Sequence, residues 1–106
     1  MVAGRDAMQT CIDILIASDN LTSERIKQEV DFLQETLENL LLNGAISNDA
    51  YLDAGSIEGG LNMLSNLVEL GISNDEIQDH LQQLHGRACR IDEVHPNLGP
   101  ALVASR

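Results

Sequence analysis

The sequence predicts an all-α fold: an antiparallel up-and-down four-helix bundle over residues 1–90, followed by an irregular tail over residues 91–106. Three observations predict it. Apolar residues recur at helical spacing in four successive segments, capping residues stand at nearly even intervals, and the only two prolines lie near the C-terminal end. Because helices joined by connections of a few residues run antiparallel to their neighbours, the even spacing favours a bundle.

We expect the first helix from about Arg5 to Ser18 and the second from Leu21 to Asn43. Thr22 is placed to cap the free N–H groups at the start of the second helix, and Gly44 ends it. The second helix is the best defined, because its apolar residues step by four and three and fall on one stripe: Ile26, Val30, Leu33, Leu37 and Leu40.

The third and fourth helices are expected to follow two further caps, Ser47 and Ser73. The third has apolar residues at helical spacing up to Leu70, and the fourth runs from Asn74 to about Ala88. Three glycines leave two alternatives for the third helix, one continuous helix or a kink or split between Gly55 and Gly60. The second alternative arises because each interior Gly disfavours a helix by about 1 kcal/mol relative to Ala.

The tail loses the helical periodicity after Cys89, and Pro96 disfavours helical geometry at the residue before it. A free tail rarely carries many aliphatic residues, so we expect this irregular segment to dock on the bundle. The aliphatic residues available for docking are Ile91, Val94, Leu98, Leu102 and Val103.

The charge is strongly negative and unevenly distributed. Seventeen acidic and six basic side chains give a net charge of −11, and no Lys or Arg occurs from Gln28 to Gly86. Such a surface repels phosphate groups and anionic lipids, so neither direct nucleic-acid binding nor membrane binding is expected. The acidic surface serves solubility or attracts a partner protein with a basic surface.

No targeting or membrane-spanning segment is apparent in the sequence. The apolar run from Cys11 to Ala17 is short and contains Asp13, and no cleavage pattern follows it. We therefore expect a cytoplasmic protein.

Ligand-type side chains cluster only at His80, His85 and Cys89. His85 and Cys89 share a helix face, but His80 lies about 140° away around the helix, which argues against a zinc site. Ser and Asp residues gather at helix caps, the acidic pairs lie on exposed helix faces, and the glycines form no phosphate-binding loop. The sequence therefore predicts no metal, no cofactor and no enzymatic activity.

The two cysteines, Cys11 and Cys89, are expected to be reduced and mostly buried. If the first and fourth helices are antiparallel neighbours, Cys11 lies level with about Leu81, which leaves Cys89 about 12 Å further along. A disulfide needs Cα atoms within about 7 Å of each other.

Apolar side chains exceed what one helical stripe needs. Leu70 is interpreted as core filling. Four others, Phe32, Leu42, Met63 and Leu67, are candidates for a protein interface, because clustered apolar side chains that remain exposed mark partner or self-association surfaces.

The function predicted from these features is that of a small, non-enzymatic acidic protein that binds another protein as a regulator, inhibitor or chaperone. The alternative is a self-assembling homo-oligomeric structural subunit, with a homodimer as the expected form. A third interpretation, mimicry of nucleic acid by spaced carboxylates, ranks below both. The identity of the partner is not encoded in any motif of the sequence.

Overall fold

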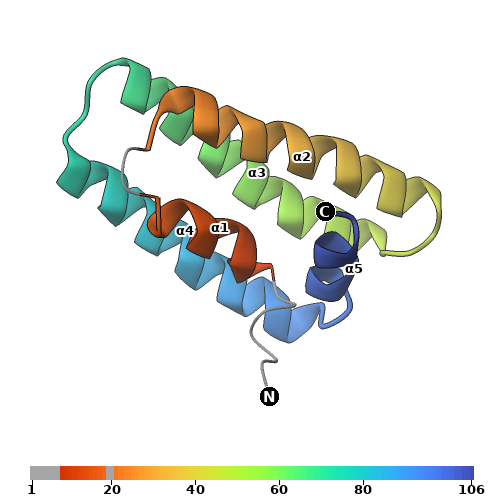
Figure 1. Cartoon of the computed structure of the whole chain (residues 1–106). Helices are drawn as coiled ribbons and strands as arrows, with labels where there is room; N and C mark the ends of the chain where they lie inside the picture. Colours follow the sequence, from red (N-terminus) through yellow and green to blue (C-terminus); the bar gives the residue numbers. More distant parts are fainter. Residues whose placement is uncertain (1–7, 19–20) are drawn as a thin grey trace.

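The computed structural model describes residues 8–18 and 21–106, and these residues form α-helices and no β-strand (Figure 1). The helices are α1 (Gln9–Ile16), α2 (Ser23–Leu42), α3 (Asn48–Glu69), α4 (Asn74–Val94) and α5 (Leu98–Ala104). Helix α3 packs against both α2 and α4, α1 packs against α4, and α5 packs against α2. The predicted all-α class is therefore confirmed, with five helices among the described residues instead of four.

Three helices begin at the predicted caps. The side chains of Thr22, Ser47 and Ser73 each accept a hydrogen bond from the backbone N–H three residues further on. Ser73 also takes part in a complete capping box. The connections after α2 and α3 contain Gly44 and Gly71 at φ +75° and +90°, which is the left-handed conformation that glycine adopts without strain.

Helix α1 has a capping acceptor that comes from another helix. The Asp92 carboxylate of α4 accepts hydrogen bonds from the backbone N–H groups of Met8 and Gln9, at 2.6 and 3.2 Å. These N–H groups have no partner within α1, so the contact fixes the start of α1 against α4. The predicted start at Arg5 lies outside the described residues, and α1 ends at Ile16, two residues before the predicted end.

Helix α3 continues through its three glycines without interruption, so the predicted split does not occur. Gly60 has a role inside the protomer, because a Cβ atom there would lie 2.5 Å from a Cδ atom of Leu84. Because Gly60 has no side chain, α3 and α4 can approach each other closely at this position. Gly55 and Gly59 have no such neighbour, since a Cβ atom at either position would meet nothing within 4 Å.

The irregular tail predicted for residues 91–106 is wrong in its secondary structure. Helix α4 continues past Ala88 to Val94 and crosses the predicted boundary between residues 90 and 91. The chain then turns at His95, which has φ −125° and ψ 73°, and α5 begins two residues after Pro96. Pro100 is the third residue of α5, a position where the helix needs no backbone N–H donor.

The docking of this segment is confirmed for Leu98 and Leu102, which are almost fully buried. Val94 does not dock and is 68% exposed. Helix α5 closes the end of the core, where it packs against α2.

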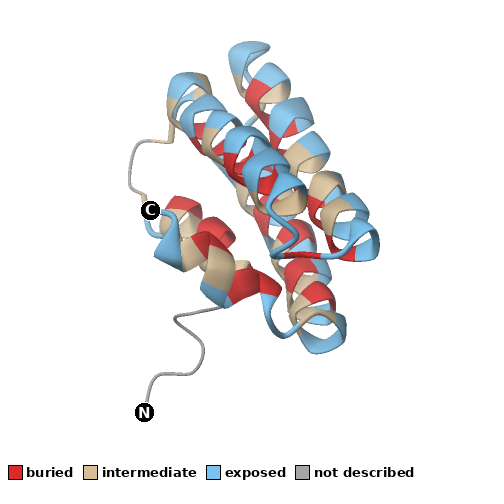
Figure 2. Cartoon of the chain, turned by 90° about the vertical axis from the view of Figure 1, so that its right-hand side faces the viewer, coloured by how far each residue is buried: buried red, intermediate tan, exposed pale blue. Residues whose placement is uncertain are grey.

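The core is almost entirely aliphatic and lies on the inward sides of the helices (Figure 2). Its largest fully buried side chains are Met8, Ile12, Leu15, Ile26, Leu33, Leu37, Ile57, Leu61, Leu64, Leu81, Leu98 and Leu102. Full burial of one such side chain contributes about 1.5–3 kcal/mol. Within the described part of the chain, no helix combines the length and the hydropathy needed to cross a bilayer.

Candidate interaction surface

One face of α3 is turned to solvent along the whole length of the helix and carries no charge. We call it the α3 outer face and define it by six residues, Leu52, Gly55, Gly59, Met63, Asn66 and Leu70. These residues are spaced three or four positions apart, and the stripe from Leu52 to Leu70 spans 18 residues, which is five helical turns. The residues therefore form a straight line of side chains along α3.

The acidic residues of α3 lie off this line, and three of them are directed to neighbouring segments. Glu69 accepts a hydrogen bond from Lys27 of α2 at 2.6 Å, and an Asp53 oxygen lies 2.8 Å from a ring nitrogen of His95. Glu58 lies close enough to Glu38 of α2 for that carboxylate to raise its pKa, in addition to the larger effect of burial. The outer face is left neutral in a chain of net charge −11.

The exposure of the large apolar side chains is high on this face. Leu52 is 67% exposed, Met63 61% and Leu70 81%. The core-filling role expected for Leu70 is therefore wrong, because Leu70 is the C-cap residue of α3 and is exposed to solvent. Between the exposed side chains, Gly55 and Gly59 form a low stretch of bare backbone. Large apolar residues on both sides of a stretch without side chains are suited to the close approach of another helix.

The two sides of the α3 outer face carry opposite charges. On the α2 side, Glu35 and Glu38 are exposed, and Glu38 lies beside Glu58. On the α4 side, Arg87 and Arg90 line a pocket of about 260 Å³ together with residues of α3 and with Val94. Neither arginine forms an ion pair with a described residue.

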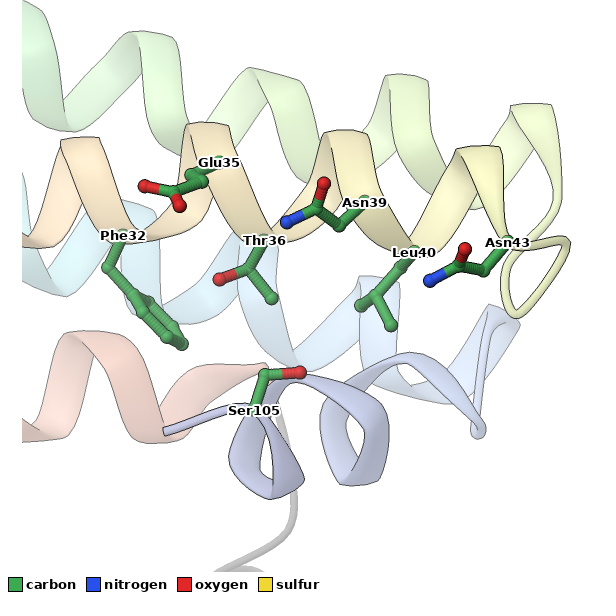
Figure 3. A pocket seen from close by; sticks show the side chains of 7 residues that line it. All are labelled: Phe32, Glu35, Thr36, Asn39, Leu40, Asn43 and Ser105. Carbon is green, nitrogen blue, oxygen red and sulfur yellow. The ribbon is translucent and has the colours of Figure 1, made fainter.

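The four predicted interface residues do not share one location. Met63 and Leu67 lie on α3, and Leu67 is half-buried at the edge of its outer face. Leu42 is strongly exposed at the end of α2. Phe32 projects from α2 toward α5, where it lines a pocket of about 330 Å³ with Ser105 (Figure 3). The role of these four residues in an interface stays a prediction.

Phe32 is covered within the protomer by Arg106. The Arg106 guanidinium carbon lies 4.2 Å from the centroid of the Phe32 ring, in a cation–π arrangement. The same guanidinium forms an ion pair with Glu29, whose side chain is buried, and donates a hydrogen bond to the Cys11 Sγ at 3.3 Å. Arg25 adds a second cation 3.6 Å from a Glu29 oxygen. This cluster connects α1, α2 and the residues after α5.

The chemistry of the cluster is structural. The pKa of the Cys11 thiol is raised to about 11, mainly by burial and also by the neighbouring Glu29 carboxylate, against the opposing effect of Arg106. A thiol with this pKa is protonated at neutral pH and is a poor nucleophile. The buried carboxylate of Glu29 has cationic partners on two sides, which is how a buried charge is tolerated.

His85 and Cys89, which the sequence analysis weighed as ligands, have partners on α1. The His85 Nε2 lies 3.1 Å from an Asp13 oxygen, and the Cys89 Sγ donates a hydrogen bond to Gln9 at 3.1 Å. His80 is half-buried on the same helix. Among the described residues, no group of three or more His, Cys, Asp or Glu side chains is arranged to hold a metal ion.

The same contacts correct the predicted register of the two cysteines. Because Asp13 lies beside His85 and Gln9 beside Cys89, Cys11 is level with about Arg87 and not with Leu81. The two thiols are free and have different partners, since Cys11 contacts Arg106 while Cys89 contacts Gln9. Cys11 and Cys89 therefore lie at nearly the same level along α1 and α4, and the large offset between them that was predicted from the sequence is wrong.

Comparison with protein-family models, with curated proteins and with solved structures gave no match to this chain.

Leu52, the two glycines and the pair Arg87 and Arg90 were not predicted from the sequence to be part of this surface. A signal for the glycines was present, because Gly55 and Gly59 share a 3.6-residue stripe with Leu52 on which no charge falls. The position of the arginines beside this stripe depends on how α3 and α4 pack, which the sequence alone does not specify.

Proposed function

We propose that this chain is a non-enzymatic protein that acts by binding protein surfaces through the α3 outer face. The observation that carries the proposal is the neutral, exposed apolar stripe of that face, which runs for five turns of α3 while the acidic residues of the helix lie elsewhere. Exposed apolar area of this extent on a small domain is typical of interaction sites. A role as a regulator, inhibitor or chaperone follows from covering a partner's surface.

The scaffold that we propose for this role is an antiparallel up-and-down four-helix bundle of α1 to α4, with α5 docked at one end. In this arrangement α3 is packed on both sides by α2 and α4, which favours a fixed orientation of its outward face. A pre-organised surface loses less conformational entropy on binding than a mobile one. The acidic α2 side favours partners with a basic surface, and the cytoplasm remains the proposed location.

The test places a photo-crosslinking amino acid at Met63 and, as a control, at Gln82, which is exposed on α4. Both proteins are irradiated in a lysate of the native host, and the adducts are identified by mass spectrometry. We expect protein adducts at residue 63 and not at residue 82, and we expect Gly59→Glu in the same protein to abolish them. Equal labelling at both positions, or none at residue 63, contradicts the proposal.

The second candidate function is a self-assembling homo-oligomeric subunit. The observation that favours it is the opposite charge of the two sides of the α3 outer face, since Glu38 stands on one side and Arg87 and Arg90 on the other. In the crosslinking experiment, this candidate predicts adducts between two copies of the chain.

A further inference from the structure

We propose that the α3 outer face binds a second copy of this chain, around a two-fold axis that runs parallel to α3. The inference rests on the proposed function and names the partner of the same surface. It follows from the distribution of charge, from the positions of the glycines and from the area of the face.

Charge limits where two copies of this chain can meet. Two molecules of net charge −11 repel each other over most of their surfaces. The exposed side of α2 carries one cation, Lys27, which is paired with Glu69 of α3. The other exposed charges on that side are carboxylates, at Glu24, Asp31, Glu35 and Glu38, so two copies that meet there place mostly like charges together. The α3 outer face is free of charge over its whole length, and close contact between copies is tolerated there.

The charged residues on the two sides of the α3 outer face lie at similar positions along the axis of α3. Arg87 and Arg90 stand beside Asp53 and Ser56, because these residues line one pocket. Glu38 stands at nearly the same level on the opposite side of α3, beside Glu58. The middle of the α3 outer face is therefore bordered on its α4 side by two arginines without an ion-pair partner among the described residues, next to the Asp53 carboxylate that is paired with His95, and on its α2 side by carboxylates.

A two-fold axis parallel to α3 exchanges these two sides. It places Arg87 and Arg90 of one copy against Glu35 and Glu38 of the other, and the same contact occurs a second time by symmetry. An axis across α3 instead places α2 against α2, with carboxylates facing carboxylates. Charge complementarity therefore selects the parallel arrangement.

Gly55 and Gly59 are also suited to a parallel axis. Around a parallel axis, Gly55 and Gly59 of one copy lie against the same residues of the other, and the absence of side chains lets the two backbones come close together. Leu52 and Met63, on either side of the crossing, cover the partner helix. Each glycine weakens α3 by about 1 kcal/mol relative to Ala and contacts nothing within its own protomer, so this crossing gives both a structural reason.

The electrostatic environment of Glu58 agrees with this arrangement. Burial raises the pKa of Glu58, and the neighbouring Glu38 carboxylate raises it further, so the monomer holds two acids together without a cation between them. Arg87 or Arg90 of the second copy supplies that cation. Dimer formation is therefore expected to lower the pKa of Glu58, which NMR can follow in samples of different concentration.

The area of the face sets the strength of the dimer. Helix α3 has 22 residues and is therefore about 33 Å long, and a helix face is about 10 Å wide. The face alone therefore contributes about 330 Å² per copy, which is below the roughly 800 Å² per partner of a standard specific interface, so the dimer also needs contacts from the flanking side chains. We therefore expect a reversible dimer whose population depends on protein concentration.

The test uses charge-swap variants in sedimentation velocity. We expect wild type to dimerise with rising concentration, and both Arg87→Glu/Arg90→Glu and Glu35→Arg/Glu38→Arg to dissociate at least about tenfold more readily. An equal mixture of the two variants restores complementary charges along both seams, so we expect it to form a heterodimer. All four residues are exposed, and circular dichroism verifies that both variants are folded.

A glycine pair provides the matched control. Gly59→Glu places a carboxylate in the α3 outer face, while Gly86→Glu places one at a position on α4 where a Cβ atom also meets nothing within 4 Å. We expect Gly59→Glu to be monomeric and Gly86→Glu to dimerise as wild type does. Two similarly affected variants would overturn the inference.

A monomeric wild type at every concentration also overturns the inference, as does a mixture of charge-swap variants that fails to associate. The proposed function fails separately. If wild type is monomeric while the crosslinker at Met63 captures a different protein, this inference is wrong and the proposed function stands. If residue 63 captures neither a copy nor another protein, both are wrong.

Discussion

Arg106 and Glu29 form an ion pair in which the Glu29 side chain is only 2% exposed. The cation reaches it from the residues that follow α5, and the carboxylate comes from the first half of α2. Because the guanidinium also covers the Phe32 ring, a single side chain connects the end of the described chain to its centre. The stability of the fold therefore depends on a contact between residues that are 77 positions apart in the sequence.

We predict that Arg106→Met lowers the free energy of unfolding by about 2 kcal/mol, because it leaves a buried carboxylate without its main partner. Arg25, at 3.6 Å from Glu29, keeps the loss from being larger. Urea denaturation measures the effect. The double variant Glu29→Gln/Arg106→Met removes the unpaired charge and should regain most of the stability, whereas equal losses in the single and double variants would contradict this account.

The helices were predictable where local rules act alone. The caps Thr22, Ser47 and Ser73 and the apolar stripe of α2 follow from residue types at fixed spacing, and the structure has them as expected. Helix α5 was missed because the segment after Cys89 lacks helical periodicity and Pro96 disfavours helical geometry at His95. Pro100 lies in the first turn of α5, where a proline is compatible with the helix. Burial of Leu98 and Leu102 adds stability that no local signal reports.

The candidate surface was predictable only in part. Met63 was identified from its spacing, and it lies on the α3 outer face. Phe32 was expected to be part of the same surface, but its environment is set by Arg106, which is distant in sequence and reaches it only after α5 has docked. The flanking charges could not be assigned to the two sides of α3 before the neighbours of α3 were known.

We predict a loss of stability at alkaline pH that depends on Cys11. Burial raises its pKa from 9.0 to about 11 in the folded protein, so the stabilising effect is complete below pH 9 and is lost as the pH rises toward 11. Between these values the unfolded chain gives up the thiol proton while the folded protein keeps it, and the free energy of unfolding falls by up to about 3 kcal/mol. Denaturation of wild type and Cys11→Val at several pH values measures the difference. An identical pH dependence in both proteins would show that burial does not perturb this thiol.

We predict opposite effects for two Gly→Ala substitutions in helices. Gly86→Ala meets nothing within 4 Å and should stabilise the protein by about 0.5–1 kcal/mol through helix propensity. Gly60→Ala makes the same gain but places its methyl group 2.5 Å from a Cδ atom of Leu84, which is buried. Displacing that side chain in a packed core costs about 1–3 kcal/mol, so the net effect should be destabilising. Thermal unfolding of both variants decides the matter, and a stabilised Gly60→Ala would mean that α3 and α4 are less closely packed.

We predict that Leu102→Ala lowers the free energy of unfolding by about 2–4 kcal/mol, because its side chain is almost fully buried between α5 and the core. Val94→Ala serves as the control, since that side chain is 68% exposed and its truncation should change stability by less than about 0.5 kcal/mol. The two variants remove apolar groups from neighbouring parts of the same segment, so a difference between them reports docking and not hydrophobicity alone. If α5 unfolds independently of the other helices, both variants will denature like wild type.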